Sequence, residues 1–382
     1  MSEEPLPVVV AGVHGHGRTH LANVRRLAAD GLVRLAGVCD STPLPPDALR
    51  ADGDVRQDSD LGALLRRAPA AVTILATPIH THLPLARTAL EHGSHLLLEK
   101  PPTATLAEFR ALSSAVETAG AACQIGFQSL GSSAVDAVRD LIASGAIGEV
   151  TGIGGACTWI RTSAYYDRAS WAGRRRLDGR DVVDGALTNP FAHTVATALA
   201  VAGADRAAAD GIELELFHAH DIESDDTSCV RLRAPDGTPI CIAATLCAPR
   251  HRLPRLIVHG GAGRITLFYT RDEVRLERPG TAAEVTTHPR TDLLENLVAH
   301  LRDGAPLLVP PGRTEGFMSV LEAVRRAPAP RPVPEAEQTV STEDDGVHRV
   351  ITGIEELVEE CAERITLFSE AGAPWATAGA AR

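Results

Sequence analysis

Residues 8–20, VVVAGVHGHGRTH, have the composition of a phosphate-binding turn. A β-branched run leads into three glycines, and a polar helix start follows them; these glycines are Gly12, Gly15 and Gly17. In a Rossmann fold this order holds a dinucleotide pyrophosphate, because the first amides of the helix are unpaired and its dipole favours negative charge. The dinucleotide-binding fingerprint has glycine at the position where this chain has His14. The motif alone therefore also fits a tight turn in any α/β protein.

An acidic residue follows the next predicted strand at the separation typical of dinucleotide binding. Asp40 ends the strand and lies 23 positions after Gly17, where a carboxylate accepts hydrogen bonds from the adenosine ribose. The alternative is a turn aspartate before Ser41. Because Ser41 and Thr42 follow, with no arginine to receive a 2′-phosphate, the sequence predicts NAD in preference to NADP.

Two further side chains could move a proton and hold a developing charge. A carbinol carbon releases hydride only if its hydroxyl proton also leaves, so the reaction needs a base and a cation near the oxygen. Lys100 can supply the cation and His193 the base. On a helix, Asn189 would face the same way as His193 and could bind a substrate hydroxyl or orient the imidazole. The alternatives are a surface ion pair of Lys100 with Glu99 and a buried core histidine.

The elements around these groups alternate at βαβ lengths, which predicts a parallel sheet. After the first strand at residues 8–10, the predicted strands are 32–39, 71–76, 95–98 and 122–126. The predicted helices are 20–29, 61–67, 84–92, 106–119 and 133–144. Gly12, Asp40, Thr77 and Lys100 all lie at carboxyl ends of strands, where ligands bind in such sheets.

The chain from Val150 onward has closely spaced strand-like runs, which predict a largely antiparallel sheet. These runs are 229–234, 239–246, 255–259, 264–268 and 273–277, followed by helices over 292–303 and 314–327 and a proline-rich loop over 328–342. Apolar residues three and four apart predict a last helix from about Gly346 to Glu370. We therefore expect an α/β dinucleotide-binding Rossmann domain over 1–128 and an α+β domain over 129–382, whose last helix could pack back on the first domain.

At LLLEKPP, residues 96–102, the chain resembles the Gfo/Idh/MocA oxidoreductases, named for glucose–fructose oxidoreductase and inositol dehydrogenase. The other matching pieces are GVHGHGRTH, GVCD, ATPIHTH, GFQ, LIASGAIGEV and ENLVAHLRDGAPLLVPP, which together span nearly the whole chain. The resemblance implies an N-terminal domain that binds NAD or NADP. It also implies a second domain with an open antiparallel sheet that covers the substrate and builds a homo-oligomer, a dimer or tetramer.

The same resemblance implies roles for individual residues. The cofactor contacts it implies are Gly12, His14, Gly15, His16, Gly17, Asp40, Thr77, Pro78, His82, Glu99, Lys100, Pro101 and Gln128. The expected substrate contacts are Lys100, Gln128, Trp171, Asn189 and His193, and the expected catalytic set is Lys100, His193 and Asn189. Two positions depart from the family. Many members carry aspartate at the position of Asn189, and members often carry aspartate at the position of Ala196.

Two local clusters leave alternatives open. Aromatic and basic residues before Asn189 could grip a sugar or form a solvated basic stretch; they are Tyr165, Tyr166, Trp171 and Arg174 to Arg176. His80 and His82 have the spacing of a metal pair, but no acid or third ligand accompanies them, so no metal site is expected.

Composition narrows the partners and the compartment. A chain of 382 residues with net charge −12, spread without long runs, argues against nucleic acid or an anionic membrane as partner. The seven cysteines form no CxxC pair, which favours buried free thiols in a reducing compartment. The sequence leaves no room for a signal peptide before the first strand, and no apolar run approaches the roughly 20 residues of a membrane span. We expect a cytoplasmic protein with a small-molecule substrate.

The leading hypothesis is an NAD-dependent dehydrogenase that acts on the CH–OH group of a sugar, inositol or related polyol. One alternative is a glycosidase or epimerase-like enzyme that oxidises its substrate transiently and releases no net NADH. Another is a nucleotide-binding regulator that has lost its chemistry. The altered glycine motif, Asn189 and Ala196 favour the regulator, while intact Lys100 and His193 count against it.

Overall fold

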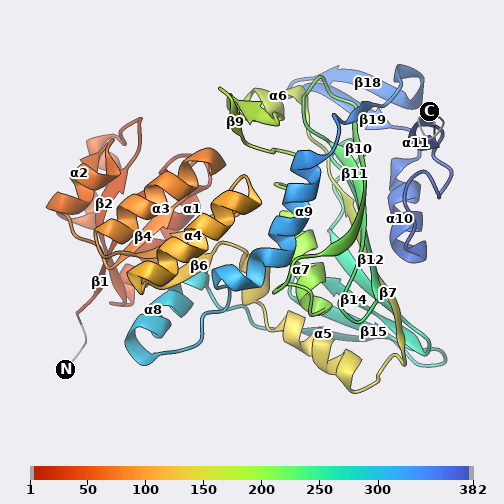
Figure 1. The fold of residues 1–382 in the computed structure, drawn as a ribbon, viewed down its shortest axis with the longest axis horizontal. Helices are drawn as coiled ribbons and strands as arrows, with labels where there is room; N and C mark the ends of the chain where they lie inside the picture. Colours follow the sequence, from red (N-terminus) through yellow and green to blue (C-terminus); the bar gives the residue numbers. More distant parts are fainter. Residues whose placement is uncertain (1–3, 378–382) are drawn as a thin grey trace. The chain divides into compact units, whose positions relative to one another are not determined.

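The computed structural model describes residues 4–377, which form two compact units. The first unit is the chain up to Phe127 together with residues 291–312, and the second is residues 128–290 with the chain from Arg313 onward. Figure 1 shows both units as ribbons. The expected single boundary after residue 128 differs from this division, because residues 291–312 return to the first unit.

The first unit contains a parallel six-stranded sheet in the order β3-β2-β1-β4-β5-β6. Its strands are β1 (Leu6–Ala11), β2 (Val33–Cys39), β3 (Arg56–Asp58), β4 (Val72–Leu75), β5 (His95–Leu98) and β6 (Cys123–Ile125). Val8, Val9 and Val10 of the central strand β1 have no exposed surface, as expected where helices cover both faces of a parallel sheet. The predicted α/β fold is confirmed, although β3 was not predicted.

In the described part of the first unit the α-helices are α1 (Gly17–Ala29), α2 (Leu61–Arg67), α3 (His82–Glu91), α4 (Leu106–Ala119) and α8 (Leu293–Asp303). Helix α8 is followed by a segment that joins the sheet edge at β6. The Ile125 amide donates to the Val309 carbonyl at 2.8 Å, and the Gln124 side chain donates to Asn296 Oδ1 at 2.6 Å. These bonds explain why residues so late in the chain belong to the first unit.

The second unit contains a nine-stranded sheet in the order β16-β15-β14-β13-β7-β12-β11-β10-β17. Its strands are β7 (Val150–Thr158), β10 (Asp210–His218), β11 (Thr227–Arg233), β12 (Pro239–Thr245), β13 (Arg255–Gly260), β14 (Gly263–Phe268), β15 (Glu273–Glu277), β16 (Glu284–Thr287) and β17 (Arg331–Pro332). Only the β7–β12 and β10–β17 pairs are parallel. The predicted largely antiparallel sheet is confirmed, although β7 and β10 were not among the runs identified.

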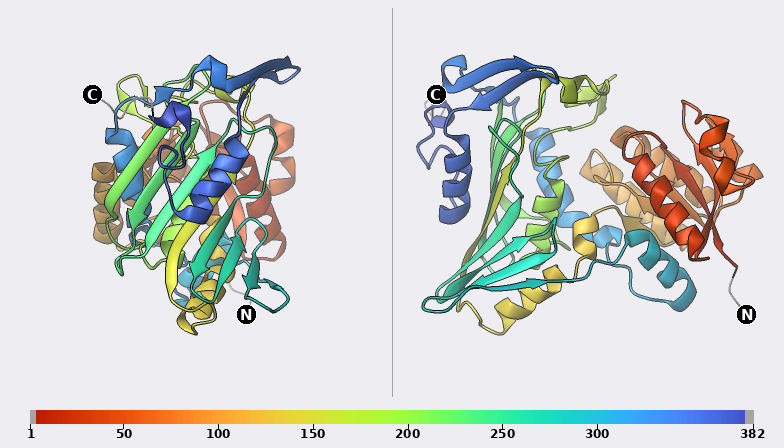
Figure 2. Two further views of the ribbon diagram at one scale, coloured as in Figure 1. Left: turned by 90° about the vertical axis from the view of Figure 1, so that its right-hand side faces the viewer. Right: turned by 180° about the vertical axis from the view of Figure 1, so that it is seen from behind.

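Helices cover both faces of this sheet. On one face lie α5 (Ala134–Ala143), α7 (Ala192–Val201) and α9 (Glu315–Arg326), and on the other lies α10 (Ile354–Arg364) (Figure 1). Figure 2 shows α10 lying against the sheet. A Cβ atom at Gly154 of β7 would lie 1.9 Å from the Ala362 carbonyl oxygen of α10, so this close contact requires glycine. The last helix thus packs on the sheet of its own unit.

The segment before α10 also differs from expectation. Instead of a loop and the start of a long helix, residues 338–351 form a hairpin of β18 (Gln338–Glu343) and β19 (Gly346–Ile351). Gly353, in a left-handed conformation with φ of 69°, separates the hairpin from α10, and Ile365, with φ of 57°, ends the helix. Val347 and Ile351 satisfy the four-residue spacing of a helix but belong to a strand.

All seven cysteines are buried and free, as predicted. Within residues 4–377, no helix combines the length and apolar character needed to cross a membrane.

Candidate functional site

The glycine turn between β1 and α1 is shaped by two close backbone contacts. A Cβ at Gly12 would lie 2.4 Å from the Ala76 carbonyl oxygen, and one at Gly17 would lie 1.8 Å from the Gly12 carbonyl oxygen. At Gly15, where φ is 54°, no atom lies within 4 Å of a Cβ position. The helix start is therefore held tightly against the sheet while the turn beside Gly15 stays open, which fits a pyrophosphate.

The first turn of α1 differs from the expected row of unpaired amides. The Gly17, Arg18 and Thr19 amides donate to the carbonyls three residues earlier, at 3.0, 3.3 and 2.9 Å. These bonds tighten the helix start, so any phosphate contact with free amides would come from the turn before Gly17.

The Asp40 carboxylate lies at the end of β2 and bridges the glycine turn and the loop after β2. Its Oδ2 accepts from the Val13 amide at 2.9 Å, and its Oδ1 accepts from the Thr42 amide at 3.0 Å. His14 Nε2 lies 2.9 Å from the Thr42 carbonyl oxygen, so the imidazole is turned toward this loop. Asp40 thus occupies the place that a ribose-binding acid needs beside the turn.

His82 is buried and holds the ends of β4 and β5 together. Its Nε2 lies 2.8 Å from the Thr77 carbonyl oxygen, and its Nδ1 lies 3.0 Å from that of Pro101. Burial lowers the pKa of His82, although the surrounding carbonyls oppose this shift. His82 is 1% exposed, and its ring nitrogens position the backbone of Thr77 and Pro101; its expected cofactor contact stays a prediction. Pro78 is exposed beside it.

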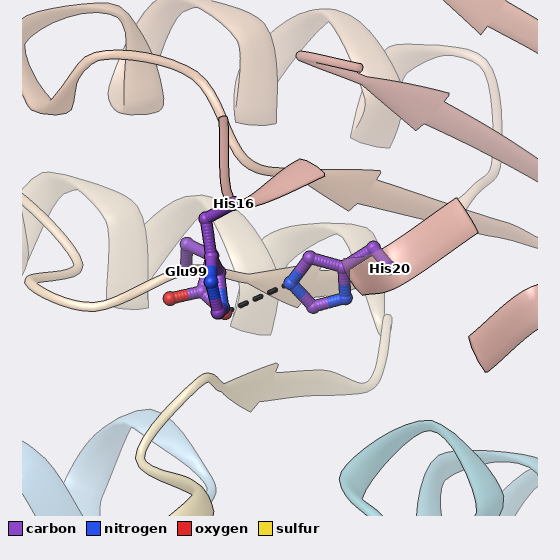
Figure 3. Close-up of side chains that lie close together, drawn as sticks. All are labelled: His16, His20 and Glu99. Carbon is purple, nitrogen blue, oxygen red and sulfur yellow. Dashed lines mark hydrogen bonds and ion pairs between the residues drawn. The ribbon is translucent and has the colours of Figure 1, made fainter. Parts of the chain in front are cut away.

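Glu99 and Lys100 follow β5, and the Lys100–Pro101 peptide bond is cis. Lys100 is half-buried, and its amide donates to Glu99 Oε2 at 3.1 Å. Glu99 Oε1 lies 2.8 Å from His20 Nε2 and 3.4 Å from His16 Nε2 (Figure 3). Burial raises the pKa of Glu99, but the bonds to His16 and His20 outweigh it and hold that pKa well below its usual range. Sequence reasoning missed His20, because it lies 79 positions from Glu99.

In the second unit, His193 lies in the first turn of α7 and is oriented by a serine. His193 Nδ1 lies 3.3 Å from Ser129 Oγ, and the Thr197 hydroxyl donates to the same oxygen at 3.0 Å. Ser129 follows Gln128 in the short helix η4 (Gln128–Gly131). The structure therefore places Gln128 and His193, two predicted site residues, on neighbouring elements.

Asn189 lies before α7 and not on it, which corrects the expected helical pairing with His193. Its backbone N–H donates to the Gly185 carbonyl in a turn, and its side-chain Nδ2 donates to Asp184 Oδ1 at 2.6 Å. Asp184 is 6% exposed, and its Oδ2 accepts from the Gly173 amide at 2.8 Å. Sequence reasoning did not find Asp184, because no spacing rule connects it with His193.

The loop before Asp184 contains a stack around Arg168. The Arg168 guanidinium lies 3.6 Å from the ring centre of Tyr165 and 4.7 Å from that of Trp171, and it pairs with Asp184 at 3.4 Å. Trp171 thus stays a candidate substrate contact.

The basic run 174–176 has structural partners. Arg175 donates to carbonyls at the end of α9, among them Ala327 at 2.7 Å, while Arg174 pairs with Glu223 and Arg176 with Asp181. These partners favour a structural role for the run over a sugar-gripping one.

Comparison with known proteins places both units in one family. Residues 6–127 match the family model described as "Oxidoreductase family, NAD-binding Rossmann fold", and residues 135–266 match the GFO/IDH/MocA C-terminal domain. A dTDP-3,4-didehydro-2,6-dideoxy-alpha-D-glucose 3-reductase of Streptomyces violaceoruber is 34% identical over 32% of this chain and 34% of its own length. Levoglucosan dehydrogenase of Pseudarthrobacter phenanthrenivorans is 26% identical over 41% of this chain and 40% of its own length. The chain thus spans less than half of either curated relative.

Solved structures share the fold over most of the chain. The WlbA dehydrogenase of Bordetella pertussis, in complex with NADH and UDP-GlcNAcA, has a TM-score of 0.70 and 19% identity, covering 87% of this chain and 100% of that one. UDP-N-acetylglucosamine 3-dehydrogenase GnnA of Acidithiobacillus ferrooxidans has a TM-score of 0.65 and 19% identity, covering 85% and 97%. Together with the glycine turn and the strand end at Lys100, the two family models show that the chain belongs to the Gfo/Idh/MocA family of NAD-binding oxidoreductases.

Proposed function

We propose that the protein is an NAD-dependent oxidoreductase that transfers hydride between the nicotinamide and the carbinol carbon of a sugar, inositol or related polyol. The observation that carries the proposal is the Asp40 carboxylate, which the Val13 amide holds beside the open glycine turn. This arrangement supports a bound dinucleotide with its ribose at Asp40 and its pyrophosphate at Gly15. Because a carboxylate repels a 2′-phosphate, the same geometry favours NAD over NADP.

The proposed chemistry divides a cation and a base between two residues. When bound, nicotinamide supplies the hydride acceptor or donor. The Lys100 ammonium would hold the substrate oxygen while negative charge develops on it. His193 would take the hydroxyl proton on Nε2 in the tautomer whose Nδ1–H donates to Ser129 Oγ. The proposal requires that one substrate reach both groups.

Asn189 has a positioning role in this proposal. Its side-chain Nδ2 donates to Asp184 Oδ1 at 2.6 Å, which fixes the orientation of the side-chain amide near His193 in the sequence. Asp184 is in turn held by the Gly173 amide. The chain therefore has a buried carboxylate behind Asn189, although the sequence has no aspartate at that position.

A six-membered sugar ring, free or attached to a nucleoside diphosphate, is the substrate class we would try first. The Arg168 stack offers aromatic faces and a guanidinium beside Asp184 and Asn189, which suits ring carbons and hydroxyls. Three similar proteins add weight to the nucleotide-linked form: a dTDP-sugar reductase, a UDP-N-acetylglucosamine 3-dehydrogenase and a dehydrogenase solved in complex with UDP-GlcNAcA.

A screen with two readouts tests the proposal. Purified protein is incubated with NAD and with sugars, inositols, amino-sugar acids and nucleotide sugars, and both reduced nicotinamide and cleaved or epimerised products are measured. Net NADH formation supports the dehydrogenase. Products without net NADH would favour the glycosidase or epimerase alternative, and tight NAD binding without turnover of any compound would favour the regulator.

We also propose a homo-oligomer, a dimer or tetramer, whose contacts avoid the part of the nine-stranded sheet that α10 covers. Helix α10 packs against β7 and β12, and residues such as Val358 and Cys361 have no exposed surface there. Light scattering of the purified chain tests this; a monomer at all concentrations would contradict it.

A further inference from the structure

Three metal-ligating side chains meet at the start of α1. His16 and His20 lie four residues apart at the beginning of the helix, and Glu99 reaches them from the end of β5 (Figure 3). One donor atom from each of the three lies within 4.8 Å of the other two. All three residues belong to the first unit.

The distances between the donor atoms are close to those of a metal site. In tetrahedral zinc coordination, bond lengths of about 2.0–2.2 Å place neighbouring ligand atoms roughly 3.3 Å apart. His16 Nε2 and Glu99 Oε1 are 3.4 Å apart, whereas His20 Nε2 and the same oxygen are 2.8 Å apart. The shorter contact has to open by about half an ångström for an ion to replace the shared proton, and the donor atoms of His16 and His20 lie within 4.8 Å of each other.

We propose that His16, His20 and Glu99 bind a divalent transition-metal ion of the Zn²⁺ class in the dinucleotide-free protein. Two imidazoles and one carboxylate form a donor set that zinc prefers, and three protein ligands leave a coordination position open. Glu99 and His20 side chains are each 8% exposed, so the ligands are held by packing, whereas His16 is 57% exposed and provides the entry path.

This site differs from His80 and His82, which have the spacing of a metal pair but at which no metal site was expected. His82 uses its ring nitrogens on backbone carbonyls, so that pair offers no common donor set. The third ligand of the new site, Glu99, is 79 positions from His20, which is why spacing did not reveal it. The inference goes beyond the proposed oxidoreductase activity and does not depend on it.

Metal titration of the full-length chain, prepared without a histidine tag and stripped with a chelator, tests the proposal. Zn²⁺ binding is followed by calorimetry, and Co²⁺ binding by the visible absorption bands of a low-coordinate cobalt site. We expect one equivalent of each ion to bind. Because even a partner behind a metal ligand contributes about 10–100-fold to affinity, His16→Ala should weaken binding by at least about a hundredfold.

His14→Ala is the matched control, since His14 lies two residues away with its ring bonded toward Thr42. It should bind both ions as the wild type does. His16→Cys, which restores a ligand as thiolate, should recover binding and add a sulfur-to-cobalt charge-transfer band. Because His16 is largely exposed, unchanged melting temperatures should show that its variants fold.

Two results would overturn the proposal. One is a wild-type chain that binds neither ion, in which case the cluster is only a hydrogen-bonded ion pair. The other is a loss of metal affinity that is equal in His14→Ala and His16→Ala, which would mean that the ions bind to scattered surface histidines.

Discussion

Gly17 offers a sharp test of the cofactor site, because its backbone is helical and only a clash forbids alanine. By helix propensity alone, Gly17→Ala would stabilise α1 by roughly 1 kcal/mol. The added Cβ would, however, lie 1.8 Å from the Gly12 carbonyl oxygen and 2.7 Å from the Gly12 carbonyl carbon. Both atoms are backbone, so no side chain can move aside, and the helix start has to retreat.

The size of the retreat sets the expected effect. Since Cβ contacts under 3.0 Å essentially never occur, the turn and helix must separate by about 1.2 Å. In catalytic sites a misplacement of about 1 Å can cost on the order of a hundredfold in rate, and we take the same factor for the affinity of the positioned pyrophosphate. We therefore expect the NAD dissociation constant to rise about a hundredfold, or roughly 2.7 kcal/mol, by calorimetry.

Gly31→Ala is the control at the other end of α1. Gly31 has φ of 73° with no atom within 4 Å of a Cβ, so alanine meets strain there but no clash. That strain costs about 1–2 kcal/mol of stability and should leave NAD affinity unchanged. If folded Gly17→Ala bound NAD as tightly as the wild type, or if Gly31→Ala weakened it equally, the turn would not be the pyrophosphate site.

Three other changes test separate parts of the site. Lys100→Met should lower turnover about a hundredfold, roughly 3 kcal/mol, while NAD affinity by calorimetry changes far less; wild-type turnover would refute the role of Lys100. Asp40→Asn should weaken NAD about tenfold or more and narrow the preference over NADP, as paired titrations would show; an unchanged ratio would argue against the ribose contact. Burial lowers the pKa of His82 below its usual 6.5, so the unfolded chain binds a proton there more readily than the folded chain. The free energy of unfolding should therefore be highest above about pH 6.5 and fall as the pH drops through that value. The melting temperature of the wild type should be lower at about pH 5.5 than at about pH 7, and the difference should be smaller in His82→Gln. An equal difference in both proteins would assign the pH dependence to other groups.

Local signals explain why much of the first unit could be predicted. Helices α2 and α4 begin and end where the sequence indicated, because their ends carry their own signals. The Asp60 side chain accepts from the Ala63 amide, the Thr105 side chain accepts from the Glu108 amide, and Gly120 is left-handed after α4. Each of these contacts joins residues within a few positions and can be recognised without the fold.

The second unit was harder to predict because its exceptions depend on tertiary contacts. Strand β7 contains Gly154 and Gly155, and glycine has a low propensity for β-strands. In the structure Gly154 is needed because α10 lies against it. The long helix expected from Gly346 failed for a similar reason: its periodic apolar residues also suit a hairpin, and Gly353 divides the two.

The candidate site shows the same division between local and distant information. The glycine turn, Asp40 and Lys100 follow strands and could be placed from the sequence at one sheet edge. The partners of Glu99 could not, because His20 meets it only when β1 and β5 enter one sheet. For the same reason the bond of His82 to the backbone of Pro101 could not be predicted from the sequence.

Asn189 bears most directly on whether the chain has kept its chemistry. Read as a motif position, it removes a carboxylate and favours an inactive regulator. In the structure the side-chain Nδ2 of Asn189 donates to the Asp184 carboxylate at 2.6 Å. That carboxylate also accepts from the Gly173 amide and pairs with Arg168. Ala196, the other departure, is 3% exposed within α7, where an unpaired carboxylate would be costly. The charge missing from the motif is thus present nearby, supplied by Asp184 five residues before Asn189, so these departures do not argue for lost activity.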